Sequence, residues 1–482
     1  MSTQHPDNVT IPFFADDSIL SGEDEIKEAY YVFSHLGCTE QMWDCEGKEV
    51  DEYVIKKLLT RYDQFFEHKR LGRDLFLTLR VPNPIYEKQE AKILLETLES
   101  IPRSFDTARL IYNDDLPPIF EVILPMTTSA DALNQIYYYY RDFVSGKQNR
   151  FFYPGNINIR EWIGEFKPEK VMVIPLVEDI PYLLGIDRLV RDYLKEKSLP
   201  YLRVFLARSD PALNYGILAT VLVLKIALIS LHTVEQQLGI PIYPILGVGS
   251  CPFRGNFNPV SFENCLRGYP SVQTFTIQSA FKYDYDEQSV MKAIEKIYQK
   301  ERSAPLPIDE DQAKELIEKS SQSYRQQVYT LAPLVNEVSR YIPARRMRKL
   351  HIGLFGYSRE VGRVHFPRVI TFCAALYSIG LPPELIGLSS LSVERISSLR
   401  KMYPGFDQDL KDAAQYWNPE CKKLIPLEVF HEIEKGISFI EYTPDPQHLE
   451  ITTRIIRDLS GKNDSTLQEL AIRAGKVRRF LG

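Results

Sequence analysis

The sequence predicts an α/β protein, a (β/α)8 TIM-like barrel with additional C-terminal α-helices. Three observations favour this fold class. Short apolar runs alternate with helical patterns over residues 1–357. Most of these runs are continuous, as in parallel strands that are buried on both faces. Beyond residue 300 the remaining patterns are almost all helical. With 44% hydrophobic residues among 482, the chain can also bury a large core.

Eight apolar runs are the candidate strands. Most of them end in polar or charged residues, and a helical pattern follows. In chain order they are 39–44, 75–81, 120–126, 171–178, 203–210, 243–249, 275–281 and 350–357. Eight strands separated by helices favour a closed barrel, and an open doubly wound sheet is the alternative.

Helical patterns lie between these strands and dominate the rest of the chain. We expect helices between the strands at 48–66, 87–100, 129–145, 180–197, 211–237 and 286–300. Further helices are expected at 309–339, 366–378, 382–386, 392–402, 407–417, 426–436 and 465–478. We therefore expect a barrel over 1–357 that includes the N-terminal segment, and a helical elaboration over 358–482 packed on it as one structural unit.

Composition excludes several classes of protein. The formal net charge is −6 and there is no long basic run, which argues against nucleic acid as a partner. No pair among the six cysteines has the CxxC spacing of a zinc ribbon. The first residues lack a signal-peptide pattern. The apolar stretch 217–230 carries Lys225 and is shorter than the ~20 residues of a membrane span, so we expect a buried helix and a cytoplasmic protein.

Two candidate strands end in carboxylates. Glu178 and Asp210 follow apolar runs at 171–178 and 203–210. In a barrel the chemistry lies at the carboxyl ends of the strands, and a hard cation such as Mg²⁺ takes one or two carboxylates and leaves its other positions to water and substrate. The alternative is that each carboxylate caps the helix that follows it.

Arginines near other strand ends are candidates for binding an anion. Arg254 follows the glycines Gly247 and Gly249, which let a ligand approach the backbone closely, although a turn with a surface arginine has the same pattern. Arg80 ends an apolar strand, where it needs either an internal carboxylate or an anionic substrate as partner. Arg368 opens an apolar helix, a place where a cation opposes the helix dipole unless an anion lies nearby.

Three further features have competing interpretations. Arg359 lies among several guanidinium groups after the last candidate strand. The basic cluster 345–349 is interpreted as a solvated or subunit-facing surface. His5 stands in the first five residues, where a frayed tail is the usual structure.

In sequence order, these residues resemble the phosphoenolpyruvate carboxylase family, in its short archaeal-type form. Thr3-Gln-His5-Pro-Asp is similar to the family's Thr-x-His-Pro motif. Other similar segments are 77–80 around Arg80, 176–178, 209–216, 253–255, 278–283 and the stretch from Pro367 to Gly387. Each match is short, but together they run in family order from residue 3 to residue 387.

The resemblance implies a carboxy-lyase. Its reaction is the Mg²⁺-dependent, irreversible and anaplerotic carboxylation of phosphoenolpyruvate by bicarbonate, which gives oxaloacetate and phosphate through carboxyphosphate and an enolate. The rivals are another Mg²⁺–enolate barrel enzyme, similar to phosphoenolpyruvate mutase or citrate lyase, and a non-catalytic anion-binding protein.

The resemblance also implies roles for individual residues. His5, Arg254 and Arg368 would be catalytic, Arg80, Arg254, Arg359 and Arg368 would bind substrate, and Glu178 and Asp210 would hold Mg²⁺, with Mn²⁺ as a possible substitute. It further implies a homotetramer. Compared with the long form of the family, the chain lacks a loop His and Arg, has Leu213 in place of a Lys, and retains only part of the regulatory aspartate site.

Overall fold

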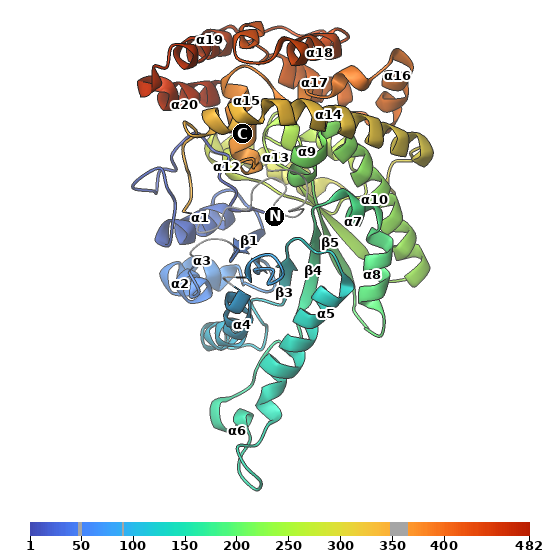
Figure 1. The fold of residues 1–482 in the computed structure, drawn as a ribbon. Coiled ribbons are helices and arrows are strands. Elements are labelled where there is room, and N and C mark those ends of the chain that lie inside the picture. Colours follow the sequence, from blue (N-terminus) through green and yellow to red (C-terminus); the bar gives the residue numbers. More distant parts are fainter. Residues whose placement is uncertain (47–50, 89–90, 348–364) are drawn as a thin grey trace.

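Seven parallel strands form one curled sheet at the centre of the molecule (Figure 1). The structure is a computed structural model, and it describes residues 1–46, 51–88, 91–347 and 365–482. The strands pair in chain order, each with the next. They are β1 (Glu40–Asp44), β2 (Phe76–Arg80), β3 (Glu121–Leu124), β4 (Met172–Val177), β5 (Leu202–Ala207), β6 (Ile242–Gly247) and β7 (Thr274–Phe275). The α/β class and the parallel sheet predicted from sequence are confirmed.

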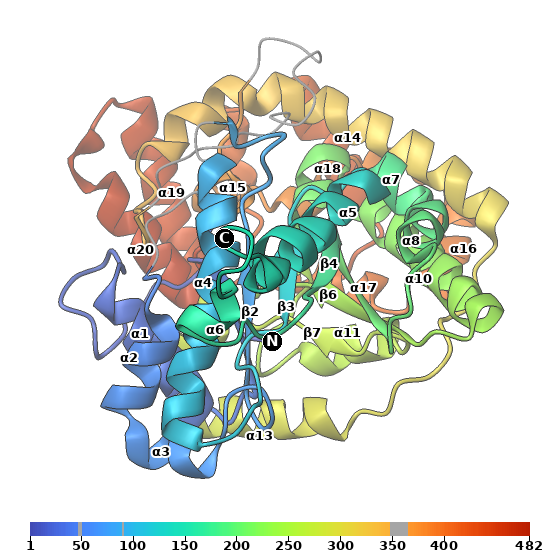
Figure 2. The same ribbon diagram turned by 90° about the horizontal axis from the view of Figure 1, so that it is seen from below.

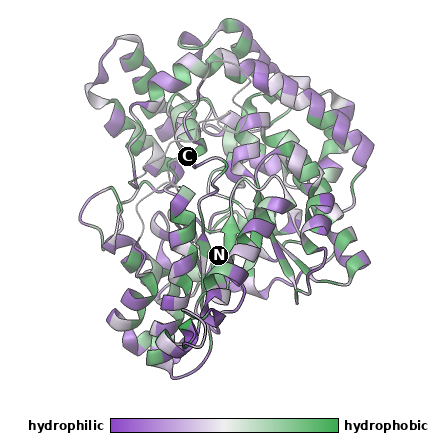
Figure 3. Cartoon of the chain, turned by 60° about the horizontal axis from the view of Figure 1, so that its bottom comes forward, coloured by the Kyte–Doolittle hydropathy of each residue, from purple (hydrophilic) through white to green (hydrophobic). Residues whose placement is uncertain are grey.

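The strands are apolar on both faces because each face packs against a different core. One face lies against the surrounding helices. The other face encloses a small separate cluster inside the curl, to which Met42, Ile123, Ile174, Leu176, Phe205, Ala207, Ile245 and Met1 contribute. Figure 3 shows the apolar residues gathered on the central strands, with hydrophilic residues on the outer helices. Burial on both faces explains the continuous apolar runs in the sequence.

Helices cover the outside of the sheet (Figure 2). Those that precede or follow strands are α1 (Glu23–Ser34), α2 (Val54–Arg61), α3 (Asp63–His68), α4 (Ala91–Tyr112), α5 (Ala130–Tyr139), α6 (Ile159–Ile163), α7 (Ile180–Leu184), α8 (Ile186–Leu194), α9 (Ser209–Tyr215), α10 (Ile217–Leu238), α11 (Phe262–Gly268), α12 (Ser279–Tyr283) and α13 (Glu287–Gln299). Helices α1, α6, α11 and α12 were not predicted. The remaining predicted positions each hold at least one helix.

The C-terminal part of the chain is helical, as predicted. It contains α14 (Glu310–Ser339), α15 (Val369–Ser378), α16 (Val393–Met402), α17 (Phe406–Ala414), α18 (Leu427–Ile437), α19 (Pro446–Ser460) and α20 (Leu467–Arg478). Helices α14 and α15 pack on α9, the helix that follows β5. The C-terminal layer therefore lies over the carboxyl end of the sheet, at the top of Figure 1.

Helix α10 is the one helix in the described part of the chain that is long and apolar enough on its own to cross a membrane. However, 78% of its apolar window is buried inside the fold. The bent pair Val369–Ser378 and Pro383–Ser390 passes the same test only if it is taken as one span. Burial of α10 agrees with the core helix expected from the sequence.

The structure departs from the prediction at two places. The expected strand at 275–281 is limited to β7, because α12 begins at Ser279. There the Asp7 carboxylate accepts a hydrogen bond from the Ala280 N–H (2.7 Å) and lies 3.0 Å from the Ser279 hydroxyl oxygen. The expected helix at 211–237 is broken at Gly216, which has φ 84° and would place a Cβ 2.9 Å from the Tyr324 ring. The pattern of a short apolar run is the same in a buried strand and in a buried helical segment, so the sequence alone could not distinguish them here.

The expected eighth strand at 350–357 lies outside the described residues, as does the proposed boundary between 357 and 358. Among the described residues, the start of the chain lies between the two edges of the sheet. Ser2 N–H donates to Glu40 O (2.7 Å) and Ser2 O accepts from Met42 N–H (2.8 Å). On the other side, Thr3 N–H donates to Ile277 O (2.9 Å) and Met1 O accepts from the Ile277 N–H (2.9 Å). Residues 1–3 thus join β1 to the segment after β7.

We expect Ser2→Pro to destabilise the whole fold. Proline has no N–H to donate to Glu40 O, and this buried carbonyl would keep only the weak Cys38 thiol donor (3.4 Å), at a cost of about 1–3 kcal/mol. The midpoint of thermal unfolding should therefore fall by several degrees. The control is Ile11→Pro, since Ile11 lies in the exposed part of the same segment. Equal midpoints for Ser2→Pro and the wild type would show that the sheet does not depend on this bridge.

Candidate active site at the carboxyl ends of the strands

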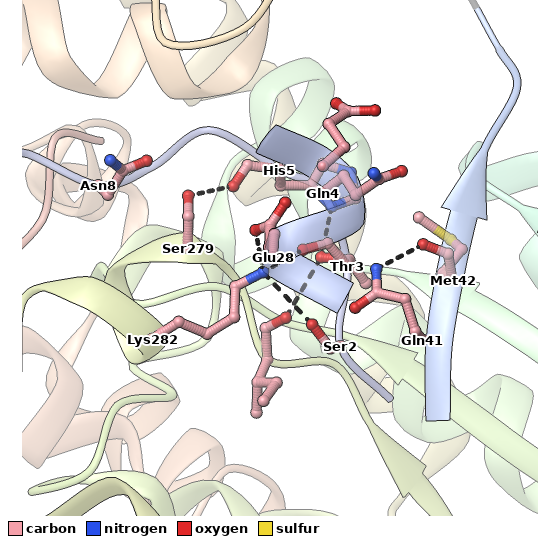
Figure 4. Close-up of polar contacts among 12 residues, drawn as sticks. Ser2, Thr3, Gln4, His5, Asn8, Glu28, Gln41, Met42, Ser279 and Lys282 are labelled. Carbon is pink, nitrogen blue, oxygen red and sulfur yellow. Dashed lines mark hydrogen bonds and ion pairs between the residues drawn. The ribbon is translucent and has the colours of Figure 1, made fainter. Parts of the chain in front are cut away.

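The N-terminal segment brings His5 into the fold. Residues 1–4 are buried and His5 is half-buried, so the segment is not a frayed tail. The His5 carbonyl accepts hydrogen bonds from Asp7 N–H (3.1 Å) and from the Ser279 N–H (3.3 Å) and hydroxyl. Figure 4 shows this segment lying between β1 and the residues around Ser279. The imidazole Nδ1 is 2.8 Å from the hydroxyl oxygen of Thr3.

Glu178 and Asp210 form a pair of neighbouring carboxylates, as their positions after β4 and β5 predicted. Burial raises the pKa of Glu178 well above its ordinary value, and the charge of Asp210 raises it further. Burial also raises the pKa of Asp210, while Arg368 opposes the shift. Neither residue is a helix cap. Glu178 Oε2 accepts from Met126 N–H (2.6 Å), Asp179 caps α7, and Arg208 occupies the cap position of α9.

Arg80 is held by internal carboxylates, one of the two partners that the sequence left open. Its Nε and Nη2 donate to the two oxygens of Asp44 (2.9 and 2.7 Å), and Nη2 lies 3.0 Å from Glu46. Burial alone would lower the pKa of Arg80, but Asp44 and Glu46 hold it well above its usual value. Its charge also lowers the pKa of both Glu178 and Asp210, which places it beside the carboxylate pair.

Arg254 is fully buried, so the alternative of a surface turn is wrong. The guanidinium packs so closely on Gly249 that a Cβ there would lie 2.7 Å from its central carbon. Nη1 of Arg254 donates to Gly482 O (2.6 Å) and lies 3.4 Å from Asp7 Oδ2. Its Nε donates to Ser209 Oγ (3.3 Å), and its Nη2 donates to Gln278 Oε1. Both ends of the chain thus contact this side chain.

Arg368 is the N-cap residue of α15 and is half-buried. Its positive charge lowers the pKa of Asp210 and of Glu87, so the guanidinium lies near both carboxylates. Arg359, the remaining predicted substrate ligand, lies outside the described residues. Of the predicted site residues that the structure describes, Arg80, Glu178, Asp210, Arg254 and Arg368 are linked through their charges.

Two arginines of the basic cluster 345–349 are buried, and residues 348 and 349 lie outside the described residues. Arg345 and Arg346 are 5% and 4% exposed, which contradicts the sequence prediction. Arg346 Nη2 donates to Glu28 (2.5 and 2.7 Å), and Arg345 donates to the carbonyls of Asn8 and Val9 (3.1 and 3.2 Å). Sequence alone could not find these partners, because they are more than 300 residues away along the chain.

Several site residues were missed from the sequence. Asp44 and Glu46 stand at the end of β1, so the rule that selected Glu178 could also have found them. Glu87 gave no such signal. Both of its carboxylate oxygens are buried without a hydrogen-bond partner, and burial, with the charge of Glu46, raises its pKa to about 8.

A divalent cation fits the carboxylate pair. The charge of Asp210 raises the pKa of Glu178, and that of Glu46 raises the pKa of Asp210, and a cation beside the pair would offset this repulsion. Among the described residues no group of three or more His, Cys, Asp or Glu side chains is arranged to hold a metal. Mg²⁺ does not require one, because it commonly keeps several waters and takes only one or two carboxylates from the protein.

Comparison with known proteins gives a consistent result. A family model described as phosphoenolpyruvate carboxylase matches residues 1–482. The phosphoenolpyruvate carboxylase of Methanothermobacter thermautotrophicus is 52% identical over 482 residues, and that of Methanospirillum hungatei is 52% identical over 489. The phosphoenolpyruvate carboxylase of Pyrococcus furiosus is 47% identical over 486 residues. Each alignment covers 100% of this chain and 99% of the relative.

Glu87 should make stability fall as the pH rises. The folded protein holds the Glu87 proton up to about pH 8, whereas the unfolded chain releases it near its ordinary pKa of about 4.3. Between these values the folded state binds more protons, so the free energy of unfolding decreases with increasing pH. Glu87→Gln stays neutral, and its thermal midpoint should rise relative to the wild type from pH 5 to 8.5, without substrate.

The matched control for Glu87 is Glu263→Gln. Glu263 is exposed and paired with Lys296, so this change should leave the pH dependence of the wild type almost unaltered. Parallel curves for Glu87→Gln and the wild type would contradict a raised pKa at this position.

Proposed function

The chain belongs to the phosphoenolpyruvate carboxylase family and is a carboxy-lyase, and on that premise we propose that it carboxylates phosphoenolpyruvate with bicarbonate to give oxaloacetate and phosphate. The observation that carries the proposal is that the charges of three arginines, Arg80, Arg254 and Arg368, act on Asp210 of the carboxylate pair, close to the segment that carries His5. Phosphoenolpyruvate has a phosphate and a carboxylate, and such a site has the charge to bind both.

Phosphoenolpyruvate carboxylases use a divalent metal ion, and we propose Mg²⁺ here, with Mn²⁺ as a substitute. Glu178 and Asp210 would hold it. When bound, the metal supplies positive charge that stabilises an enolate oxygen. Arg80, Arg254 and Arg368 would neutralise the phosphate and carboxylate of the substrate, and Arg359 would join them. Because Arg80 and Arg254 are already fixed by internal partners, they need little reorganisation when substrate binds.

Each proposed step accounts for the bonds that form and break, and His5 accepts the one proton that is released. A bicarbonate oxygen attacks phosphorus and the bond from phosphorus to the enol oxygen breaks, which gives carboxyphosphate and the enolate. His5 takes the carboxyl proton of carboxyphosphate, so that CO₂ and phosphate are released. The enolate carbon then attacks CO₂ to form oxaloacetate. Burial of Arg254 by both chain ends supports a site from which water is excluded, which protects the enolate from protonation to pyruvate.

We infer that the curled sheet is a closed (β/α)8 TIM-like barrel. The support is the hydrogen bonding of residues 1–3 to both edges of the sheet. In this arrangement the barrel within 1–357 and the helices within 358–482 form one structural unit, since Arg254 of the first part donates to Gly482 of the second.

The decisive assay uses phosphoenolpyruvate and Mg²⁺, with and without bicarbonate, coupled to malate dehydrogenase. We expect bicarbonate-dependent loss of NADH, and we expect Asp210→Asn to reduce it by at least 100-fold, because one of only two carboxylate ligands is lost (order of magnitude, about 3 kcal/mol). Asp192→Asn, an exposed change on α8, is the control.

The same assay separates the alternatives. An enzyme similar to phosphoenolpyruvate mutase or citrate lyase would not need bicarbonate, and a non-catalytic anion-binding protein would show no turnover. NADH loss that does not depend on bicarbonate, or full activity in Asp210→Asn, would contradict the proposal.

We also propose that this cytoplasmic enzyme associates with copies of itself, in line with the homotetramer that the resemblance implies. An arm formed by the end of α5, residues 140–158 and α6 projects from the body (Figure 1). It exposes Phe143, Phe151, Phe152, Tyr153, Ile157, Trp162 and Ile163. Its aromatic rings, each carrying about 150–250 Å², are half to two-thirds exposed, so they present roughly 500 Å². A stable interface needs about 800 Å² per partner, so the aromatic rings of the arm alone would supply more than half of that area.

The double variant Phe151→Ser, Trp162→Ser should lower the mass of the particle measured by light scattering after gel filtration. These side chains are 62% and 64% exposed, so the fold itself should not depend on them. The control is Leu427→Ser on α18, which is equally exposed but lies in the C-terminal layer. An unchanged mass in the double variant would exclude the arm as the interface.

A further inference from the structure

Thr3 lies in a position to control the protonation of His5. Its side chain is fully buried, and its hydroxyl oxygen has two polar neighbours. One is the carbonyl oxygen of Ile277 at 3.3 Å, and the other is Nδ1 of His5 at 2.8 Å. The Ile277 carbonyl can only accept a hydrogen bond, whereas the imidazole nitrogen can donate or accept according to its tautomer.

A hydroxyl has one proton, so the two contacts restrict each other. If Thr3 donates to Ile277 O, its oxygen accepts from Nδ1–H of His5 and both contacts are hydrogen bonds. If Thr3 donates instead to Nδ1, its oxygen lone pairs face the Ile277 oxygen at 3.3 Å in a buried place. Only the first arrangement satisfies both contacts. We propose that Thr3 is a positioning residue that fixes His5 as the Nδ1–H tautomer, which makes Nε2 the nitrogen that accepts the proton.

This arrangement suits a base, because it survives proton transfer. Both nitrogens of a protonated imidazole are donors. The Nδ1–H bond to Thr3 is therefore made before and after Nε2 takes a proton, and Thr3 does not need to rotate. Such second hydrogen bonds set the tautomer and orientation of histidines elsewhere. The role of Nε2 rests on the proposed function, but the tautomer does not.

The backbone of Thr3 is fixed by hydrogen bonds at both its N–H and its carbonyl. Its N–H donates to Ile277 O (2.9 Å), and its carbonyl accepts from Nζ of Lys282 (3.0 Å). Lys282 is fully buried and also donates to Ser2 Oγ (3.3 Å) and Glu28 Oε1 (2.5 Å). Figure 4 shows Lys282 reaching up between Glu28 and the N-terminal segment. The Glu28 carboxylate is shared with Arg346, and Arg346 also pairs with Glu25 (3.1 Å), so two cations and two carboxylates balance within the core.

The direct test is the nitrogen NMR spectrum of the histidine side chains in the full-length protein, without substrate. The chain has eight histidines, and the signals of His5 are identified as those that are missing from the spectrum of His5→Asn. We expect the wild type and Thr3→Ser, which keeps the hydroxyl, to show a protonated Nδ1 and an unprotonated Nε2. Thr3→Val has the same shape without the hydroxyl and should show a mixture of tautomers. A protonated Nε2 in the neutral wild-type imidazole would overturn the proposal, even if neither Thr3 variant folds.

The second readout is the amount of oxaloacetate formed per phosphate released in the presence of bicarbonate. If His5 is the base, Thr3→Val should lower this ratio by about tenfold, the effect of about one hydrogen bond to a charged group, while the KM for phosphoenolpyruvate changes less than about twofold. Thr3→Ser should restore most of the ratio, and His5→Asn gives its lowest value.

The outcomes distinguish the tautomer of His5 from the proposed carboxylation reaction. Equal loss of both products in Thr3→Val, with a lower thermal midpoint, would assign Thr3 a structural role only. If the wild type forms no oxaloacetate, the proposed function fails, and the NMR result still decides the tautomer.

Discussion

The structure depends on one constraint, the insertion of the first residues of the chain between the two edges of the parallel sheet. Unpaired edges expose backbone donors and acceptors that must find partners, and Ser2 and Thr3 supply them on both sides. The insertion requires a buried anchor, which Lys282 and Glu28 provide. Because His5 follows this bridge directly, the same contacts that complete the sheet also place the imidazole beside the strand ends.

The charged groups around the candidate site are paired locally, and the net charge of the chain does not reflect them. The net charge of −6 gives no hint of the proposed anion site, because Arg80 and Arg254 are paired with carboxylates inside the fold. Arg80 lies against Asp44 and Glu46, and Arg254 lies near Asp7. Such pairs fix the guanidinium groups in place before a ligand arrives. Fixed groups aimed at one small volume are what electrostatic stabilisation of a reacting anion needs.

The two ends of the chain meet around Arg254. Leu481 N–H donates to Asp7 O (2.7 Å), and Gly482 O accepts from Arg254. A glycine stands at 482 because a Cβ there would lie 2.1 Å from the carbonyl oxygen of Ile370 on α15. The C-terminal helices are thus part of the site's support, since α15 carries Arg368 at its start and receives Gly482 against its side.

The sequence by itself determined the parallel α/β class, six of the seven strands that the structure describes and the candidate carboxylates Glu178 and Asp210. These follow from local patterns, since an apolar run buried on both faces and a polar residue at its end are visible within ten residues. Tertiary structure alone decided the rest. It made Asp44 the partner of Arg80, buried Arg254 and Arg346, and placed Thr3 against Ile277 and His5. These contacts join residues far apart along the chain, or depend on how one hydroxyl is oriented. No local pattern encodes them, because these contacts form only once residues 1–3 are hydrogen-bonded to both edges of the sheet.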